Sequence, residues 1–222
     1  MPLLAYCITQ AALPIVLSNF GVQEKKVETI SEAGLSCFVS QYEPIASGGE
    51  QLIRESALAF NRVIHEIFNH TAVIPFRFPT LLESKAQILT FLRDHSTEYQ
   101  KALSRLKDSI QMEMQISLRE QENSANSGKE SGSQYLKKRQ VKHHKLEAAA
   151  QALRQSTVQH IQEWRQREAA TGMRCYALIT RAAKDRFLEQ VQTATVPQDL
   201  MVRVTGPWPA TEFLKLKINN AE

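Results

Sequence analysis

The chain has 222 residues, of which 43% are hydrophobic, with a formal net charge of +4 and a pI near 9.0. This length allows one large or two small domains with apolar cores. This mildly basic net charge is compatible with an acidic partner. It is far from that of a dedicated nucleic-acid binder, in which the charge is clustered on a binding motif. No run reaches the roughly 20 apolar residues of a membrane span, and no Lys or Arg precedes Lys25, as a signal peptide would require. We therefore expect a cytoplasmic protein with no membrane span and no nucleic-acid partner.

The first hundred residues predict alternating strands and helices. Apolar residues alternate over 4–8 and over 35–39, which is typical of strands. A helix is predicted from Gly49 to about Asn69, because apolar residues recur there at spacings of three and four. Residues 73–78 lie between prolines, so we expect a short or edge strand.

A capping box and a clear alternation mark the next two elements. Ser84 with Gln87 predicts the start of a helix that extends to about Leu106. Residues 110–118 then alternate apolar and polar without exception, which predicts a half-buried strand. Its apolar face, which includes two methionines, is interpreted as a core face and not as an adaptable binding surface.

The second half begins with a polar segment and a long helix. Residues 119–133 contain no large aliphatic side chain, so we expect a mobile linker at 120–133 between an N-terminal module, 1–119, and a C-terminal module, 134–222. A helix of about 35 residues is predicted from there to about Ala170, ended by Gly172. Its expected buried side consists of Leu146, Ala150, Leu153, Ile161 and Trp164. A strand over 173–180, a helix over 182–193 and a strand over 201–205 complete an α+β pattern of two small modules.

No set of residues predicts an active site, a metal site or a cofactor site. The chain has no phosphate-binding loop, dinucleotide fingerprint, nucleophile elbow or C-x-x-C motif. His65 and His70 are five residues apart, which places them on different faces of a helix and argues against a shared metal. Cys7, Cys37 and Cys175 lie in apolar strand-like runs, so we expect unpaired, buried thiols in a reducing compartment.

A basic stretch opens the long helix, at residues 137–139 and 142–145. A solvated helix face is the favoured interpretation, with contact to an acidic partner second and nucleic acid a distant third. Cations near a helix N-terminus oppose the helix dipole, which adds weight to the partner interpretation.

Two proline-bounded segments supply the candidate structural or partner-binding residues. In the first, Gly206, Pro207, Trp208 and Pro209 follow the last strand, and the prolines hold Trp208 extended on a stiff backbone. We expect the indole to plug a core, with presentation to a partner as the alternative.

The second segment places Arg77 between Phe76 and Phe78, where it points away from both rings. An internal contact of the guanidinium with a carboxylate or with backbone carbonyls is favoured over a contact with a partner.

Five blocks of the sequence resemble, in the same order, the gas vesicle protein GvpL/GvpF family. The blocks are A-Y-C-I at 5–8, G-L-S-C-F-V-S at 34–40, A-V-I-P-F-R-F-P-T at 72–80, G-S-Q-Y-L at 132–136 and V-T-G-P-W-P at 204–209. The third and fifth are the most specific. The chain departs from the family pattern at Pro79, where glycine is usual, and at Ala210-Thr211, where a proline and an aromatic residue are usual.

The resemblance implies two α+β modules, the first a ferredoxin-like variant. It also implies a non-enzymatic accessory or minor structural protein of gas vesicle assembly. The implied partners are the amphipathic shell protein and other accessory proteins. Residues and spacing alone leave two alternatives open: a small-molecule-binding or catalytic α+β domain, and a regulatory interaction protein with the same fold.

Overall fold

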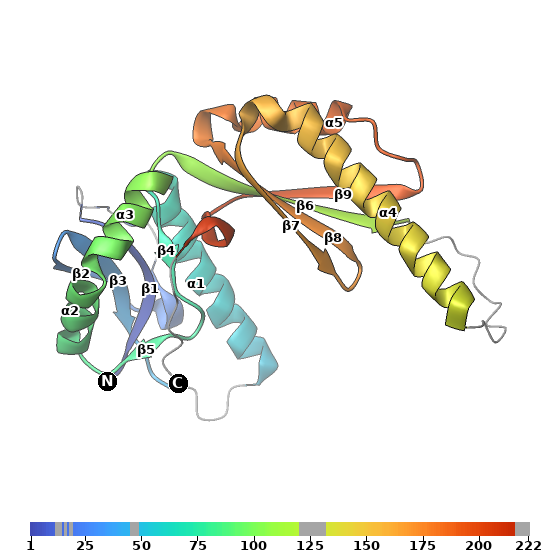
Figure 1. Ribbon diagram of the computed structural model, residues 1–222. Helices are drawn as coiled ribbons and strands as arrows, with labels where there is room; N and C mark the ends of the chain where they lie inside the picture. Colours follow the sequence, from blue (N-terminus) through green and yellow to red (C-terminus); the bar gives the residue numbers. More distant parts are fainter. Residues whose placement is uncertain (12–14, 16, 18–19, 45–48, 120–131, 216–222) are drawn as a thin grey trace. The chain divides into compact units, whose positions relative to one another are not determined.

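The protein is described by a computed structural model that covers all residues except 12–14, 16, 18–19, 45–48, 120–131 and 216–222. The chain divides into two compact units (Figure 1). The first combines Met1–Asp108 with Pro209–Glu222, and the second is Ser109–Trp208. Both contain helices and antiparallel sheets, so the predicted α+β class is confirmed. No helix in the described parts of the chain is both long and apolar enough to cross a bilayer.

The first unit is built on an antiparallel sheet with the strand order β2-β3-β1-β4, in which β5 also pairs with β1. Its elements, in chain order, are β1 (Leu3–Gln10), η1 (Val22–Glu24), β2 (Glu28–Glu32), β3 (Leu35–Gln41), α1 (Glu50–His70), β4 (Ile74–Pro75), β5 (Leu81–Leu82), α2 (Lys85–Asp94), α3 (Ser96–Leu106) and η4 (Thr211–Phe213). The predicted strands at the start, the helix α1 and the short edge strand β4 are confirmed.

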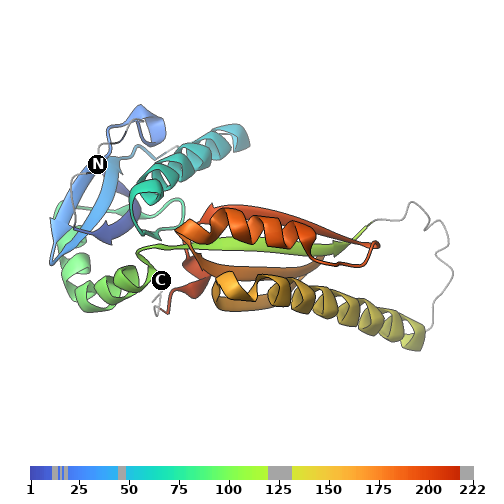
Figure 2. The same ribbon diagram turned by 90° about the horizontal axis from the view of Figure 1, so that it is seen from above.

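The central strand β1 is covered on both faces. Helix α1 lies against one face of the sheet, and α2 and α3 lie against the other (Figures 1 and 2). Residues 4–9 of β1 are consecutively buried. Tyr6 stacks on Phe60 of α1 with ring centroids 5.0 Å apart. The Tyr6 hydroxyl lies 2.9 Å from Ser40 Oγ and accepts a hydrogen bond of 2.8 Å from the backbone N–H of Val22. Ring stacking and buried hydrogen bonds therefore both stabilise the core around β1.

Two details of the first unit differ from the sequence prediction. A strand, β2, was not predicted, and it forms a hairpin with β3 through Ala33 and Gly34, whose φ angles of +48° and +74° suit a tight turn. The expected single helix from Ser84 is two helices, because α2 ends at Asp94 and α3 starts at Ser96. The predicted N-cap is confirmed, since the N–H of Gln87 donates to Ser84 Oγ at 3.3 Å.

The second unit has the element order β-α-β-β-α-β and the strand order β7-β8-β6-β9, which together are the ferredoxin-like arrangement. The family resemblance implied a ferredoxin-like variant in the first module, whereas the structure has this arrangement in the second unit. Its elements are β6 (Ser109–Leu118), α4 (Gly132–Thr157), η2 (Val158–His160), β7 (Ile161–Ala169), β8 (Gly172–Thr180), η3 (Arg181–Ala183), α5 (Lys184–Thr193) and β9 (Leu200–Trp208).

Helices α4 and α5 lie on the same face of this sheet (Figures 1 and 2). The side chains of β6 and β8 that point to that face are buried, among them Met112, Met114 and Cys175. The predicted core face of β6 is therefore confirmed. All three cysteines are free and buried, as predicted, and burial raises the pKa of the Cys37 and Cys175 thiols to about 12.

The boundary between the modules differs from the prediction at both ends. Strand β6 pairs with β8 and β9, so it belongs to the second unit and not to a module 1–119. Residues from Pro209 onward belong to the first unit and not to a module 134–222. The predicted linker, 120–133, lies outside the described residues up to 131, and α4 begins at Gly132.

The predicted long helix is too long. Helix α4 ends at Thr157, whose hydroxyl donates to the carbonyl of Leu153 at 2.6 Å. Leu146, Ala150 and Leu153 are buried as expected, but Ile161 and Trp164 lie half-buried in strand β7. Gly172 is not a helix stop but part of the β7–β8 hairpin. A Cβ atom there would lie 2.0 Å from the carbonyl oxygen of Ile116, so only glycine fits this close approach.

Candidate functional site

Trp208 ends the edge strand β9, opposite Gln111 of β6. The predicted extended backbone at the strand end is confirmed. Gly206 has a φ of +122°, and a Cβ atom there would lie 2.9 Å from the carbonyl oxygen of Gln111. The expected core plug is wrong, however, because Trp208 is 43% exposed. Its indole N–H donates to Thr205 Oγ1 at 3.2 Å, which helps to orient the ring at the surface.

The side chains of β9 alternate between the face of the sheet that the helices cover and the opposite face. Val202 and Val204 lie opposite the apolar residues of β6 and therefore face the helices. By the same register, Met201, Arg203, Thr205 and Trp208 share the opposite face, which neither α4 nor α5 covers. Met201 is 50% exposed, and Arg203 is also exposed. We call these four residues the β9 outer face. It offers an exposed thioether, a guanidinium and an indole beside the edge of a sheet.

The two aromatic rings of the segment 76–78 pack against different helices. Phe78 packs on Phe60 of α1 with centroids 5.3 Å apart, and Phe76 packs on Phe91 of α2 at 6.0 Å. Both rings are half-buried, whereas Arg77 is exposed. The Arg77 guanidinium makes no hydrogen bond or ion pair with any other described residue. The expected internal contact with a carboxylate or with backbone carbonyls is therefore not found in the described part of the chain. A contact between Arg77 and a partner stays a prediction.

The sequence motifs fall in separate units. Arg77 and its flanking rings belong to the first unit, together with Pro209, whereas Gly206, Pro207 and Trp208 belong to the second. In the sequence, these residues share only their place between prolines. The β9 outer face was missed, although the signal was present: Val202 and Val204 were predicted to share one face, which places Met201 and Arg203 on the other.

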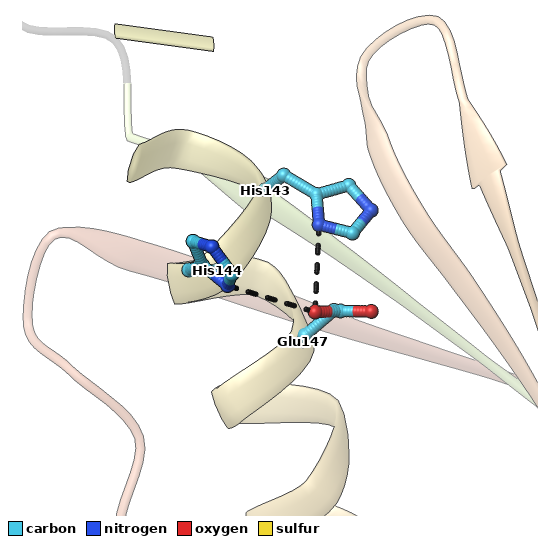
Figure 3. Close-up of side chains that lie close together, drawn as sticks. All are labelled: His143, His144 and Glu147. Carbon is cyan, nitrogen blue, oxygen red and sulfur yellow. Dashed lines mark ion pairs between the residues drawn. The ribbon is translucent and has the colours of Figure 1, made fainter. Parts of the chain in front are cut away.

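A cluster of titratable side chains lies near the middle of α4 (Figure 3). His143 Nδ1 and His144 Nδ1 lie 3.4 Å and 3.9 Å from the same carboxylate oxygen, Oε2 of Glu147. His143 Nε2 is 2.6 Å from Oε1 of Glu168 on β7. The Lys145 ammonium donates to Asp199 at 2.8 Å. By contrast, His65 and His70 of α1 are exposed, and within the described part of the chain neither belongs to a group of three possible metal ligands.

The arrangement defines a two-unit α+β protein with a ferredoxin-like second unit and a surface-exposed edge strand. The family model of "Gas vesicle synthesis protein GvpL/GvpF" matches residues 2–215. The chain therefore belongs to the GvpL/GvpF family of gas vesicle proteins, and the resemblance of its sequence blocks is confirmed.

Two solved structures share the fold of the whole chain. The gas vesicle protein GvpF from Anabaena sp. PCC7120 is 15% identical, with a TM-score of 0.78 that covers 97% of this chain and 96% of that one. GvpF from Microcystis aeruginosa is 16% identical, with a TM-score of 0.76 that covers 97% and 99% of the two chains. No curated protein sequence matches the chain. At these identities the likeness shows the fold alone, and the family assignment rests on the family model.

Proposed function

We propose that this protein is a non-enzymatic, cytoplasmic accessory or minor structural protein of gas vesicle assembly. Membership of the GvpL/GvpF family over residues 2–215 carries this proposal. The partners we propose are the amphipathic shell protein and other gas vesicle accessory proteins. A subunit that assembles into a wall exposes strand edges and apolar patches before it assembles, and these favour aggregation unless another protein covers them.

The β9 outer face is the proposed contact surface for the shell protein. Strand β9 lies at the edge of its sheet, and an edge strand can accept an added strand through its backbone. Trp208 and Met201 flank that edge with exposed apolar side chains. Trp is enriched among the residues that dominate binding energy at protein interfaces, and Met adapts its shape to varied partners. Backbone pairing would provide affinity, and the two side chains would provide selectivity.

A binding titration with purified shell protein tests the contact. We expect Trp208→Ala to weaken binding by about 2 kcal/mol or more, roughly 30-fold, as for an interface anchor. Val158→Ala is the matched control, because Val158 is 60% exposed in the same unit but lies on η2, away from β9. We expect no change for this control. Equal binding by the wild type and Trp208→Ala would remove β9 as the contact surface.

The family-level role has a separate test. Deletion of the gene in a gas-vesicle-forming host should reduce or abolish vesicles, and the wild-type gene should restore them. Restoration by Val158→Ala but not by Trp208→Ala would link the surface to assembly. Normal vesicles after deletion would contradict the assembly role itself.

A further inference from the structure

We propose that His143, His144 and Glu147 form a surface site for a divalent metal ion of the zinc type, in which Glu168 orients His143. The three ligands are spaced i, i+1 and i+4 on α4, so the carboxylate lies one helical turn beyond both imidazoles. Figure 3 shows both ring nitrogens directed at the Glu147 carboxylate. Glu168, which orients His143, comes from β7, which lies beside this part of the helix.

The first argument is the position of His143 between two carboxylates. Its Nε2 atom lies 2.6 Å from Oε1 of Glu168, which is the distance of a ring N–H donor to a carboxylate. With Nε2 donating to Glu168, Nδ1 is the ring nitrogen that offers a lone pair, and it lies 3.4 Å from Oε2 of Glu147. A metal ion between Nδ1 and the carboxylate would be bound by both groups.

The second argument is that His144 faces the same oxygen. One metal ion could therefore bind His143, His144 and Glu147 together. The three donor atoms already lie within 4.8 Å of one another.

The distances from the two imidazoles to the Glu147 oxygen suit a zinc ion after a small adjustment. Zinc binds imidazole nitrogen and carboxylate oxygen at about 2.0–2.2 Å, which places tetrahedral donors about 3.4 Å apart. The separation of 3.4 Å between His143 and Glu147 fits without movement. The separation of 3.9 Å from His144 has to shorten by about 0.5 Å, the difference between the two values, and His144 is exposed enough to rotate. Water would take the fourth position.

The donor set selects the class of metal. Two imidazoles and one carboxylate favour Zn²⁺, Cu²⁺ or Ni²⁺, whereas Mg²⁺ and Ca²⁺ prefer oxygen donors throughout. Glu168 completes the arrangement seen in many zinc sites, in which a metal-bound histidine donates its other ring N–H to a carboxylate. Lys142 is an adjacent positive charge, whereas Lys145 is paired with Asp199. We therefore expect weaker binding than at a buried structural zinc site.

Calorimetric titration of the full-length, untagged chain with Zn²⁺ tests the proposal, and competition with a coloured chelator provides a second measurement. We expect one Zn²⁺ per chain. His143→Ala and Glu147→Gln should each weaken binding at least 100-fold. Glu168→Gln should weaken it 10- to 100-fold, the usual range for a group that orients a ligand. His70→Ala, which changes an exposed histidine of α1, is the matched control and should leave binding unchanged.

Co²⁺ provides a readout that a merely structural role would not change. The visible absorption of bound Co²⁺ should appear with the wild type and with His70→Ala, and should be lost with His143→Ala. Circular dichroism verifies that each variant is folded. Absence of saturable Zn²⁺ binding by the wild type would overturn the proposal and assign the cluster to protonated histidine ion pairs. Binding that survives both His143→Ala and Glu147→Gln would overturn it equally.

Discussion

The sheet of the first unit has helices on both faces, whereas the sheet of the second unit has its helices on one face only (Figures 1 and 2). The difference is visible when the central strand β1 is compared with the edge strand β9. Residues 4–9 of β1 are consecutively buried, but β9 alternates more buried and more exposed positions along most of its length. A strand covered on both faces contributes only to the core, whereas a strand covered on one face can also contribute to a surface. This contrast is why we propose β9 as a contact surface for a partner.

The largest expected effect comes from the core of the first unit. Phe60 is 2% exposed and packs against both Tyr6 and Phe78. Phe60→Ala should lower the free energy of unfolding by about 3–5 kcal/mol, because it removes a large buried ring and leaves a cavity. Leu58→Ala on the same helix is the control, since Leu58 is 57% exposed and should change stability by no more than about 0.5 kcal/mol. Urea denaturation measures both. Similar losses would show that α1 does not cover the sheet as described.

A pair of tyrosines on the central strands of the two sheets sharpens the comparison. Tyr6 and Tyr176 are both nearly fully buried. The Tyr6 hydroxyl contacts the buried Ser40 side chain and the Val22 N–H, whereas the Tyr176 hydroxyl accepts from the exposed Arg167 at 2.7 Å. Loss of the first hydroxyl leaves buried groups without a partner, but Arg167 can turn to water.

Tyr6→Phe should therefore cost about 1–3 kcal/mol and Tyr176→Phe less than about 1 kcal/mol. Denaturation of the two variants under identical conditions measures the difference. Equal costs would mean that the hydroxyl of Tyr176 is as closed to water as the hydroxyl of Tyr6. The stated contrast between the two hydroxyls would then be wrong.

These contrasts were only partly predictable from the sequence. The alternation over 110–118 identified β6 and its core face, because Ile and Met alternate with polar residues there. Strand β7 was mistaken for helix. Its Glu, Gln, Arg and Ala residues favour a helix locally, and only pairing with β8 makes them a strand. Charged residues at a sheet edge also protect it from unwanted pairing.

The candidate site was predictable to the same partial extent. The prolines around Trp208 indicate an extended backbone, but which groups cover the indole depends on the tertiary fold. The spacing of His143, His144 and Glu147 can be read along one helix. The contribution of Glu168 could not be predicted, because residues around 168 were assigned to that same helix instead of to β7. The proposed helix ligands follow from their spacing along α4, whereas the pairing of β7 with β8 places the residue that orients His143.

Trp208→Ala tests how much a partly exposed ring on β9 contributes to stability. The ring is 43% exposed, so its removal forfeits only about half of the burial of a core aromatic. We expect a loss of about 1–2 kcal/mol in the free energy of unfolding, clearly below that of Phe60→Ala. Chemical denaturation provides the value, and Phe60→Ala serves as the reference. A loss of 3 kcal/mol or more would restore the core-plug interpretation and weaken the proposed role in binding.

The smallest expected effect concerns an exposed ion pair of the second unit. The hydrogen bond from Lys145 holds the pKa of the Asp199 carboxyl below its ordinary value of 3.8. A lowered pKa in the folded state means that the unfolded chain takes up the proton first as the pH falls. The contribution of the pair is therefore fully present above the ordinary pKa of aspartate and disappears as the pH falls through the folded value.

Asp199→Asn tests this sign directly. The melting temperature of the wild type should exceed that of the variant by a small, constant amount near neutral pH, and the two should converge below about pH 3.8. Because the pair is exposed, 1 M NaCl should shrink the difference. Thermal melts at several pH values measure it. If the difference in melting temperature instead grows as the pH falls, the pKa of Asp199 would be raised in the folded state and not lowered. It would mean that Asp199 repels its surroundings in the folded state, and that Lys145 does not help to hold α4 at the start of β9.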